Sequence, residues 1–264
     1  MRFPQTNKPP LGSLINWAHP LAKGLVGCWL MNEGSGNRIS DLSGNGNNGT
    51  LIGANGLPTW VPGRSGPALS FDAVDDYAIV PHSSSLNLGN TVTFASWIYP
   101  TSFTGYRTVV AKAYSVFWFG LDGGSGRIQL WVGNVANQSD GAVQLNKWSY
   151  IAATWNGTTI NYYINGLYDS FDSNANSATT NLLNMYIGAD REGVTDPTYF
   201  FPGLIDIVHI YNRALLAQEI WQLYAFPYAM FERRPYWMNY VAAGGLVIPV
   251  SKHVRSLSPN FHVY

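Results

Sequence analysis

The sequence predicts an all-β protein: an antiparallel jelly-roll β-sandwich with one short helix and an extended arm at each end. Three observations indicate this fold. Strand-like runs recur between turn signals from Gly24 to Tyr211, as in sandwiches built from many short strands. Only residues 214–224 show helical periodicity. Charged residues make up 11% of the 264 residues and aromatic residues 14%, and such a chain is expected to fold around a core rather than stay disordered.

The predicted strands alternate between two faces or are short apolar runs next to turns. Residues 126–133 alternate most clearly, with one set of side chains on each face: Ile128, Leu130 and Val132 against Arg127, Gln129 and Trp131. Further strands are predicted at 68–72, 76–80, 91–100, 108–113, 116–121, 148–170, 185–189 and 203–211. Within 148–170, Asn156-Gly157 and Asn165-Gly166 predict hairpin turns, because Asn and Gly accept the positive φ that such turns need.

The helix predicted at 214–224 places Leu216, Ile220 and Leu223 at helical spacing. The expected organisation is therefore an N-terminal arm (1–23), a sandwich domain (24–224) and a C-terminal arm (225–264). Both arms are basic while the body between them is acidic. Such a distribution fits arms that strap onto a neighbouring copy, although it also arises by chance.

The C-terminal arm is apolar and aromatic, but proline and glycine break it repeatedly. Its large side chains need a surface to bury against, either on the chain's own sandwich or on another subunit. The sequence leaves both alternatives open. The residues predicted to form this assembly arm are Phe226, Tyr228, Met230, Phe231, Arg233, Arg234, Tyr236 and Trp237.

Composition excludes several classes of partner and location. The formal net charge is +0, so no nucleic-acid partner is expected. Cys28 is the only cysteine, which excludes an intramolecular disulfide. No secretory signal and no membrane-spanning segment is recognisable, so we expect a virion or an extracellular surface reached by another route, without membrane insertion.

Residues 40–51 combine one aspartate with several asparagines and glycines. One interpretation is a tight loop, because Asn and Gly tolerate positive φ. The other is a loop whose carboxylate and amide oxygens bind a hard cation such as calcium.

The order of motifs resembles the laminin-G-like, concanavalin-A-like jelly-roll family. The resemblance is carried, in order, by GLVGCWLMNEGSGNRISDLSGNGNNGTL (24–51), ALSFDAVDDYAIVP (68–81), VTFASWIYP (92–100), WSYIAATWNGTTINYYINGL (148–167) and FPGLIDIVHIYNRALLAQEI (201–220). It implies the jelly-roll fold for residues 24–224. It says less about function, because lectins, adhesion modules, enzyme appendages and virion components share this architecture.

The family often carries a structural calcium, and the resemblance implies Asp41, Asn47 and Asp206 as ligands. A second acidic set is an alternative: Asp72, Asp75 and Asp76. The sequence departs from the family pattern at Ala73, where glycine is usual, and at Ile207, where an acid is usual. The missing acid weakens the calcium prediction, because affinity depends on ligand charge.

Catalysis is not expected. Glycoside hydrolases on related sandwiches place two carboxylates on one cleft-facing strand. The four glutamates, Glu33, Glu192, Glu219 and Glu232, form no Glu-x-Asp pairing, and Glu219 lies on the predicted helix and Glu192 in a loop. The histidines are dispersed without metal-ligand spacing, and neither a nucleophile elbow nor a phosphate-binding loop motif occurs.

Neutral polar groups beside exposed aromatic rings are typical of carbohydrate-binding surfaces. Gln129, Trp131 and Tyr163 are the predicted ligand-binding residues, because they project from the polar side of their strands; Tyr106 and Trp118 are weaker candidates. For each ring, the alternative is that it simply covers a sheet face.

These observations predict a non-catalytic structural or display protein, a bacteriophage capsid decoration, fibre or tail-associated subunit. It would form a homo-oligomer or bind other virion proteins, and its jelly roll would bind cell-surface glycans. The short arm sequence PYAMFERRP also resembles extensions of phage-encoded laminin-G-like proteins. The alternative is a lectin-like or adhesion module of a bacterial surface protein.

Overall fold

The computed structural model describes residues 7–112, 116–133, 135–191, 197–232, 240–241 and 247–248. The chain divides into a unit that ends at Phe231 and a second unit, Glu232–Tyr264. In the second unit, β17 (Tyr240–Val241) and β18 (Val247–Ile248) pair antiparallel. The predictions for four arm residues lie outside the described residues: Arg233, Arg234, Tyr236 and Trp237.

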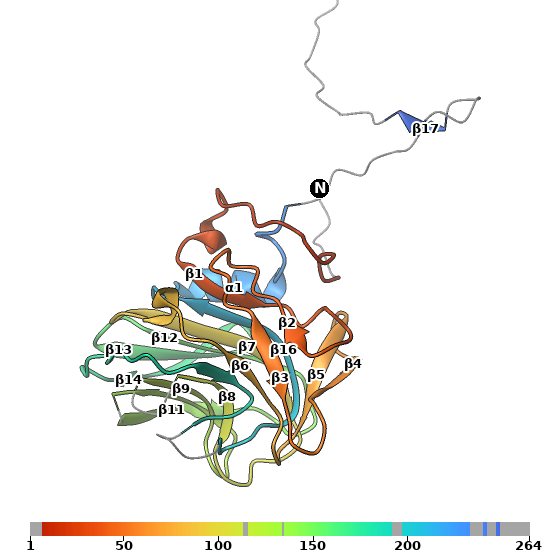
Figure 1. Ribbon diagram of the computed structural model, residues 1–264. Coiled ribbons are helices and arrows are strands. Elements are labelled where there is room, and N and C mark those ends of the chain that lie inside the picture. The colour runs from red at the N-terminus through yellow and green to blue at the C-terminus, as the bar shows by residue number, and fades with distance from the viewer. Residues whose placement is uncertain are drawn as a thin grey trace, which may run out of the picture. The chain divides into compact units, whose positions relative to one another are not determined.

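The described part of the first unit forms two antiparallel sheets that face each other, as the jelly-roll prediction requires (Figure 1). Sheet I has the order β14 (Leu167–Ser173), β13 (Thr159–Ile164), β12 (Ser149–Trp155), β7 (Val92–Pro100), β16 (Pro202–Tyr211), β5 (Pro67–Asp72) and β4 (Thr59–Pro62), and β1 (Leu25–Trp29) also pairs with β16. Sheet II has the order β11 (Val135–Ala142), β10 (Arg127–Val132), β9 (Phe117–Leu121), β8 (Arg107–Lys112), β15 (Met185–Ile187), β6 (Tyr77–Val80), β3 (Gly49–Ile52) and β2 (Arg38–Ile39).

Alternating side chains from both sheets form the core between them. The predicted alternation of β10 is confirmed, since Ile128, Leu130 and Val132 lie in the core cluster. Phe94 of β7 lies in the same cluster, whereas Trp97 of that strand belongs to a second cluster on the outer face of sheet I. Each sheet therefore has an outer face with side chains of its own.

Both predicted hairpin turns are confirmed. Asn165 and Gly166 have φ of 51° and 78° between β13 and β14, the backbone that a two-residue hairpin needs. At the β12–β13 turn, Gly157 has φ 97°. There the side chain of Asn156 accepts the backbone N–H of Thr159 at 2.8 Å.

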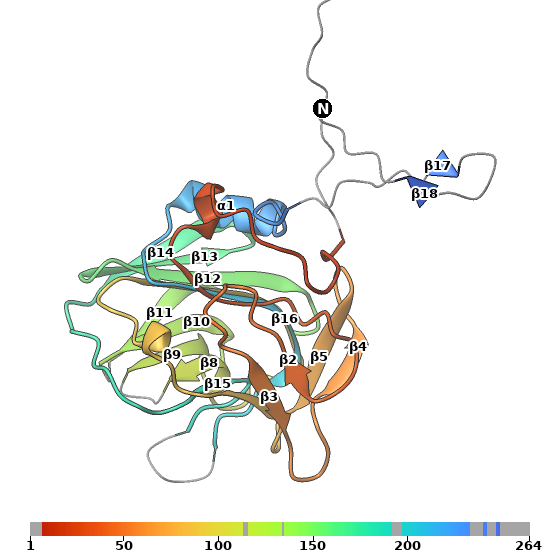
Figure 2. The ribbon, with the colours of Figure 1, turned by 45° about the horizontal axis from the view of Figure 1, so that its top comes forward.

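The outer face of sheet I is covered by other parts of the chain. Figure 2 shows the N-terminal segment and α1 (Ala217–Ala225) lying together over this sheet. The segment includes a short 3₁₀ helix, η1 (Pro20–Ala22), and a second one, η2 (Ser84–Leu86), follows β6. The covering side chains that are buried are Ile15, Leu21, Ala22, Ile220, Leu223, Tyr228, Met230 and Phe231.

Three residues predicted for the assembly arm thus belong to the sandwich. Tyr228, Met230 and Phe231 are buried in the cluster that covers sheet I, and Phe226 is half-buried with its ring against Trp221. For these residues, packing on the chain's own sandwich holds. The first unit accordingly extends to Phe231, beyond the predicted boundary at 224.

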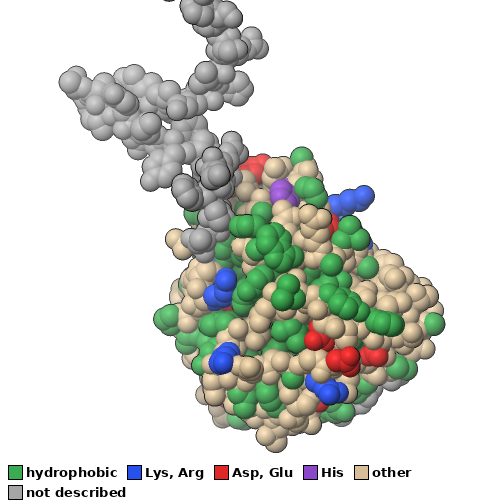
Figure 3. All heavy atoms as spheres, turned by 180° about the vertical axis from the view of Figure 1, so that it is seen from behind, with side chains coloured by type: hydrophobic (Ala, Val, Ile, Leu, Met, Phe, Trp, Pro, Cys, Tyr) green, Lys and Arg blue, Asp and Glu red, His purple; other side chains and the backbone are tan. Residues whose placement is uncertain are grey.

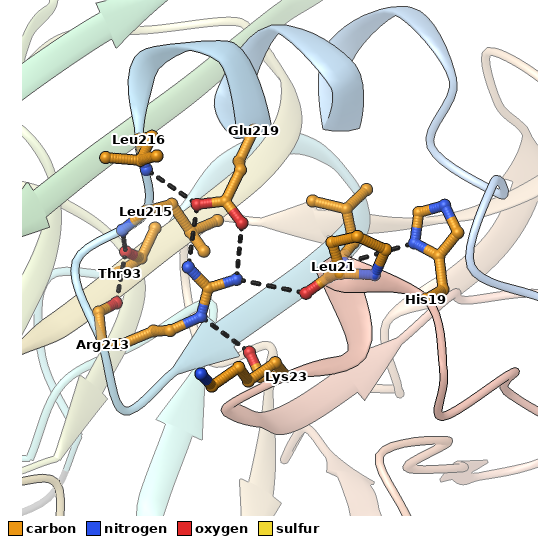
Figure 4. Close-up of polar contacts among 9 residues, drawn as sticks. His19, Leu21, Lys23, Thr93, Arg213, Leu215, Leu216 and Glu219 are labelled. Carbon is orange, nitrogen blue, oxygen red and sulfur yellow. Dashed lines mark hydrogen bonds and ion pairs between the residues drawn. The ribbon is translucent and has the colours of Figure 1, made fainter.

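Arg213 joins the N-terminal segment to α1 (Figure 4). Its guanidinium forms a two-pronged ion pair with Glu219, at 2.8 and 2.7 Å. It also donates to the backbone carbonyls of Lys23 at 2.7 Å and Pro20 at 3.3 Å. Glu219 in turn accepts the backbone N–H of Leu216 at 2.9 Å, which satisfies a free donor at the helix start.

The helix prediction is confirmed with one difference. Ile220 and Leu223 are buried, but Leu216 precedes the helix and its side chain is 70% exposed. Among the described residues, no helix is both long and apolar enough to cross a membrane.

Candidate functional site

The outer face of sheet II carries a group of aromatic side chains. Trp118 of β9 and Trp131 of β10 are cross-strand neighbours whose ring centroids lie 5.7 Å apart. The ring of Tyr106 meets their rings edge-on, at 6.0 and 5.5 Å, and meets that of Tyr199 at 5.5 Å. These four residues are called the aromatic group below.

Hydrogen bonds fix both indoles of the aromatic group. Trp118 Nε1 donates to Thr108 Oγ1 at 2.8 Å, and Trp131 Nε1 donates to Gln129 Oε1 at 2.9 Å. Gln129 Nε2 then donates to Gln138 Oε1 at 3.2 Å. This chain of contacts connects the buried Trp131 to the exposed Gln138, so a polar group stands at the edge of the rings.

Exposure within the aromatic group is unequal. Trp118 and Trp131 are 1% and 7% exposed, whereas Tyr106 and Tyr199 are half-buried. A ligand on this face would therefore meet the tyrosines, with the tryptophans as their support.

Tyr199 is held in an unusual backbone conformation. Its φ is 54°, and residues other than glycine, asparagine and aspartate rarely adopt such a positive φ. Thr108 N–H donates to its carbonyl at 3.0 Å, and the bridge between Asp190 and Thr198 precedes it. Strain of this kind persists where surrounding contacts impose it and is common at binding sites.

A small hollow lies on the same face of sheet II. It has a volume of about 100 Å³ and is lined by Leu182, Leu183, Asn184, Tyr186 and Arg191. Tyr186 belongs to β15 between two core residues, which directs its ring outwards. Its hydroxyl lies 3.3 Å from an Arg191 guanidinium nitrogen.

The structure brings two of the three predicted ligand-binding residues together. Gln129 and Trp131 lie side by side on sheet II, while Tyr163 lies on the outer face of sheet I, with its ring against Tyr168. All three are buried, with exposures of 6%, 7% and 4%. The exposure that the prediction assumed is absent, and neighbouring side chains cover these groups. Sequence reasoning missed Tyr199, because nothing in the pattern of its loop shows that it returns to sheet II.

The opening loop is organised by Asp41. Its Oδ1 accepts the backbone N–H groups of Cys28 and Ser43 at 2.9 and 2.8 Å. Its Oδ2 accepts the hydroxyl of Ser43 and the N–H of Asn47 at 2.7 and 2.9 Å. Both oxygens are occupied by donors, so the tight-loop interpretation describes these contacts.

Asn47 and Asp206 also have partners within the chain. Asn47 Nδ2 donates to Val26 O at 3.0 Å, and its Oδ1 accepts the hydroxyl of Ser83 at 2.6 Å. Asp206 forms a buried ion pair with Lys8, whose side chain is 4% exposed. Burial raises the pKa of the Asp206 carboxyl, and Lys8 opposes that shift. The contacts of Asp41, Asn47 and Asp206 do not fit a shared calcium.

The alternative acidic set does form a cluster. Oxygens of Asp72, Asp75 and Asp76 lie within 4.8 Å of one another, and no other such group of three occurs in the part of the chain that the structure describes. Burial, with Asp72 and Asp75 nearby, raises the pKa of Asp76 to about 6. Calcium binding by this cluster stays a prediction, which a calcium titration followed by melting temperature would test; an unchanged temperature would contradict it.

The two-sheet architecture is that of a jelly-roll sandwich. The family model described as Concanavalin A-like lectin/glucanases superfamily, of laminin-G type, matches residues 72–221. The chain belongs to this superfamily, which confirms the resemblance seen in the sequence. A search of curated proteins finds no match.

Solved structures with the same fold include binding domains. Domain 4 of an extracellular GH43 arabinanase from Geobacillus stearothermophilus, in complex with arabinotriose, has a TM-score of 0.62 and 23% identity, covering 75% of this chain and 97% of that one. The binding domain of Paraclostridial Mosquitocidal Protein 1 has a TM-score of 0.63 and 21% identity, and the match covers 79% of this chain and 53% of that one. The binding domain of Botulinum Neurotoxin DC, in complex with SialylT, has a TM-score of 0.57 and 12% identity, and the match covers 78% of this chain and 52% of that one. This chain thus spans about half of the toxin chains. At these identities the likeness shows the fold.

Proposed function

We propose that this protein is a non-catalytic carbohydrate-binding jelly roll whose ligand lies on the outer face of sheet II. The observation that carries the proposal is the aromatic group, in which half-buried Tyr106 lies against two fixed indoles and half-buried Tyr199 lies against Tyr106. Sugar rings stack on such aromatic surfaces, and neutral amides bind their hydroxyls. Gln138 supplies an exposed amide at the edge.

Similar structures support the same ligand class. The arabinanase domain was solved with arabinotriose and the neurotoxin domain with SialylT. A site of this kind would serve on an extracellular or virion surface, where glycans of a host cell are accessible.

The test compares Tyr106→Ala with the unaltered protein by calorimetric titration with arabinotriose, cellotriose and xylotriose. Loss of one ring stack should weaken binding by roughly tenfold. Tyr168→Ala is the matched control, because Tyr168 is 53% exposed on the other sheet. The proposal fails if no oligosaccharide binds the unaltered protein, or if both variants weaken binding equally.

A second candidate function is assembly through the C-terminal unit, as in a bacteriophage decoration, fibre or tail-associated subunit. The favouring observation is that Glu232–Tyr264, which carries aromatic and apolar residues, is a unit of its own. Such segments commonly order on a partner, because burial of their side chains offsets the entropy of ordering.

Light scattering on the full chain and on a chain ending at Glu232 tests this candidate. The truncation leaves Tyr228, Met230 and Phe231 in place, since these are buried in the sandwich. A defined oligomer that becomes a folded monomer supports assembly through the C-terminal unit. Two folded monomers would contradict self-assembly.

A further inference from the structure

A groove lies at the end of sheet I where β4 turns into β5. Among the described residues, β4 pairs only with β5. The groove has a volume of about 400 Å³. Its lining comes from β4, from the turn after it, from the first residue of β5 and from one glycine elsewhere in the chain: Trp60, Val61, Pro62, Gly63, Gly66, Pro67 and Gly34. Pro62 and Pro67 are opposite each other in the hairpin and both line the groove, so the groove follows the end of the β4–β5 hairpin.

A second hollow of about 400 Å³ adjoins the groove, since Gly66 and Pro67 line both. Its other lining residues come from Asn7–Leu11 and from Asn32 and Ser65. Lys8 contributes only its stem, because its ammonium is buried against Asp206. The combined surface therefore has an apolar half and a neutral polar half.

The indole of Trp60 is held in place before any ligand arrives. Its Nε1 donates to Gly36 O at 2.9 Å, and its ring packs partly buried against the core. A ring that is already fixed loses little conformational entropy on binding. The glycines along the wall leave backbone groups open to close approach.

This combination selects the class of ligand. A fixed aromatic ring beside neutral amides suits a sugar, which has an apolar face and a hydroxyl rim. Among the residues that the structure describes, those that line the groove proper carry no charge, so a charged ligand would form no ion pair with them. An added peptide strand is a poor fit, because β4 is four residues long and ends at Pro62, and short, proline-bearing edges resist strand addition.

We propose that the β4 groove is a second binding site, separate from the aromatic group, for a neutral oligosaccharide. One sugar ring stacks at Trp60, and a neighbouring unit reaches the amides of Asn7 and Asn32 across Pro67. The proposal does not depend on glycan binding by sheet II.

The test follows the Trp60 indole N–H signal by NMR while arabinotriose, cellotriose or xylotriose is added at millimolar concentration. The protein is the full chain carrying Tyr106→Ala, so that the aromatic group contributes little. Trp60→Phe assigns the signal by its disappearance. We expect at least one of the three oligosaccharides to shift this signal in a saturable way.

Two substitutions at the groove should weaken that binding by roughly tenfold or more. Val61→Arg places a long charged side chain in the groove, and Pro62→Glu places a carboxylate at an exposed position of its wall. The matched control is Val74→Arg, at a position that is 61% exposed and does not line the groove. Melting temperature identifies a variant that has failed to fold, in which case the other variant decides.

The outcomes separate this proposal from the one for sheet II. A Trp60 response that is lost with Val61→Arg or Pro62→Glu in the Tyr106→Ala protein supports the groove, and the sheet II site keeps its own calorimetric test. Binding lost only with Tyr106→Ala contradicts the groove. A Trp60 signal that none of the three oligosaccharides moves also overturns the groove proposal.

Discussion

At the scale of single residues, Ala73 and Ile207 join Tyr199 among the positions that hold a backbone conformation their side chains disfavour. Ala73 has φ 68° in the turn between β5 and β6, and Ile207 has φ 37° where the β7–β16 register shifts. Both depart from the family pattern in the sequence. Ile207 is buried in the cluster that covers sheet I, so burial of its side chain offsets its strain. Ala73 is only partly buried, so burial of its small side chain offsets less of its backbone strain.

Replacing Ala73 by glycine should therefore stabilise the protein. The left-handed conformation costs a residue with a side chain roughly 1–2 kcal/mol, and glycine removes this strain. Glycine also has greater entropy in the unfolded chain, which offsets about half of the gain in stability. We expect Ala73→Gly to raise the free energy of unfolding in urea by roughly 0.5–1 kcal/mol. Ala229→Gly is the control, because exposed Ala229 lacks a positive φ and should be destabilised instead. A decrease for Ala73→Gly would contradict the strain argument.

At the scale of elements, α1 and the N-terminal segment are stabilised together through Arg213. Its contacts to Glu219, Lys23 and Pro20 join three parts of the chain. Arg213→Ala should lower the free energy of unfolding by roughly 2 kcal/mol, since hydrogen bonds to charged groups contribute about 1.5–3 kcal/mol. Hydrogen exchange should also become faster around η1. Arg38→Ala, at an exposed residue of β2, should change neither quantity; equal effects of the two substitutions would rule out the joining role.

Strands whose side chains alternate between two faces, or whose turns carry Asn-Gly, could be predicted from the sequence, and strands without these signals could not. In β7 and β10, residues that face the core between the sheets alternate with residues on the outer face, and the β12–β14 hairpins carry Asn-Gly turns. Such alternation and turn signals are visible in the sequence. β11 is a mostly exposed edge strand and has no such pattern. It is held by β14, because Gln138 N–H donates to Asp172 Oδ2 at 2.9 Å and Gly141 N–H to Asp169 Oδ2 at 3.0 Å. Such side-chain contacts between sheet edges produce no periodic pattern in the sequence, so they could not be predicted from it.

The part of the candidate site that lies on one alternating strand could be predicted from the sequence, and the part that depends on distant segments could not. Gln129 and Trp131 face away from the core residues of their own strand, so alternation finds them. The pairing of Lys8 with Asp206 and the approach of Tyr199 to Tyr106 depend on chain segments that meet only in the fold. Resemblance assigned Asp206 to calcium, whereas the ammonium of Lys8 is its partner here.

At the scale of the whole molecule, the surface is nearly neutral while unpaired polar groups lie inside. On the face in Figure 3, charged side chains are few and hydrophobic ones gather between neutral polar groups, which suits uncharged ligands. Beneath the cover of sheet I, both ring nitrogens of His209 lack a hydrogen-bond partner among the described residues, as do the hydroxyls of Tyr150 and Tyr211. Complete burial lowers the pKa of His209 to about 4.

His209 should make the fold sensitive to acid. A histidine with a lowered pKa stabilises the fold fully above its unfolded pKa of about 6.5, and this contribution is lost as pH falls toward 4, because the unfolded chain takes up the proton first. A shift of this size corresponds to about 3 kcal/mol. Asp76, whose pKa is raised to about 6, acts in the opposite direction over the same range.

The pH effect of His209 is isolated by comparing the protein with His209→Leu, since Asp76 titrates in both. Unfolding in urea should show the unaltered protein losing about 3 kcal/mol more than the variant between pH 6.5 and 4. The variant fills the buried site without a titratable group, so even a lower absolute stability leaves its pH slope informative. Parallel pH profiles for the two proteins would mean that His209 is protonated or solvated in the fold, and that the cover over sheet I admits water.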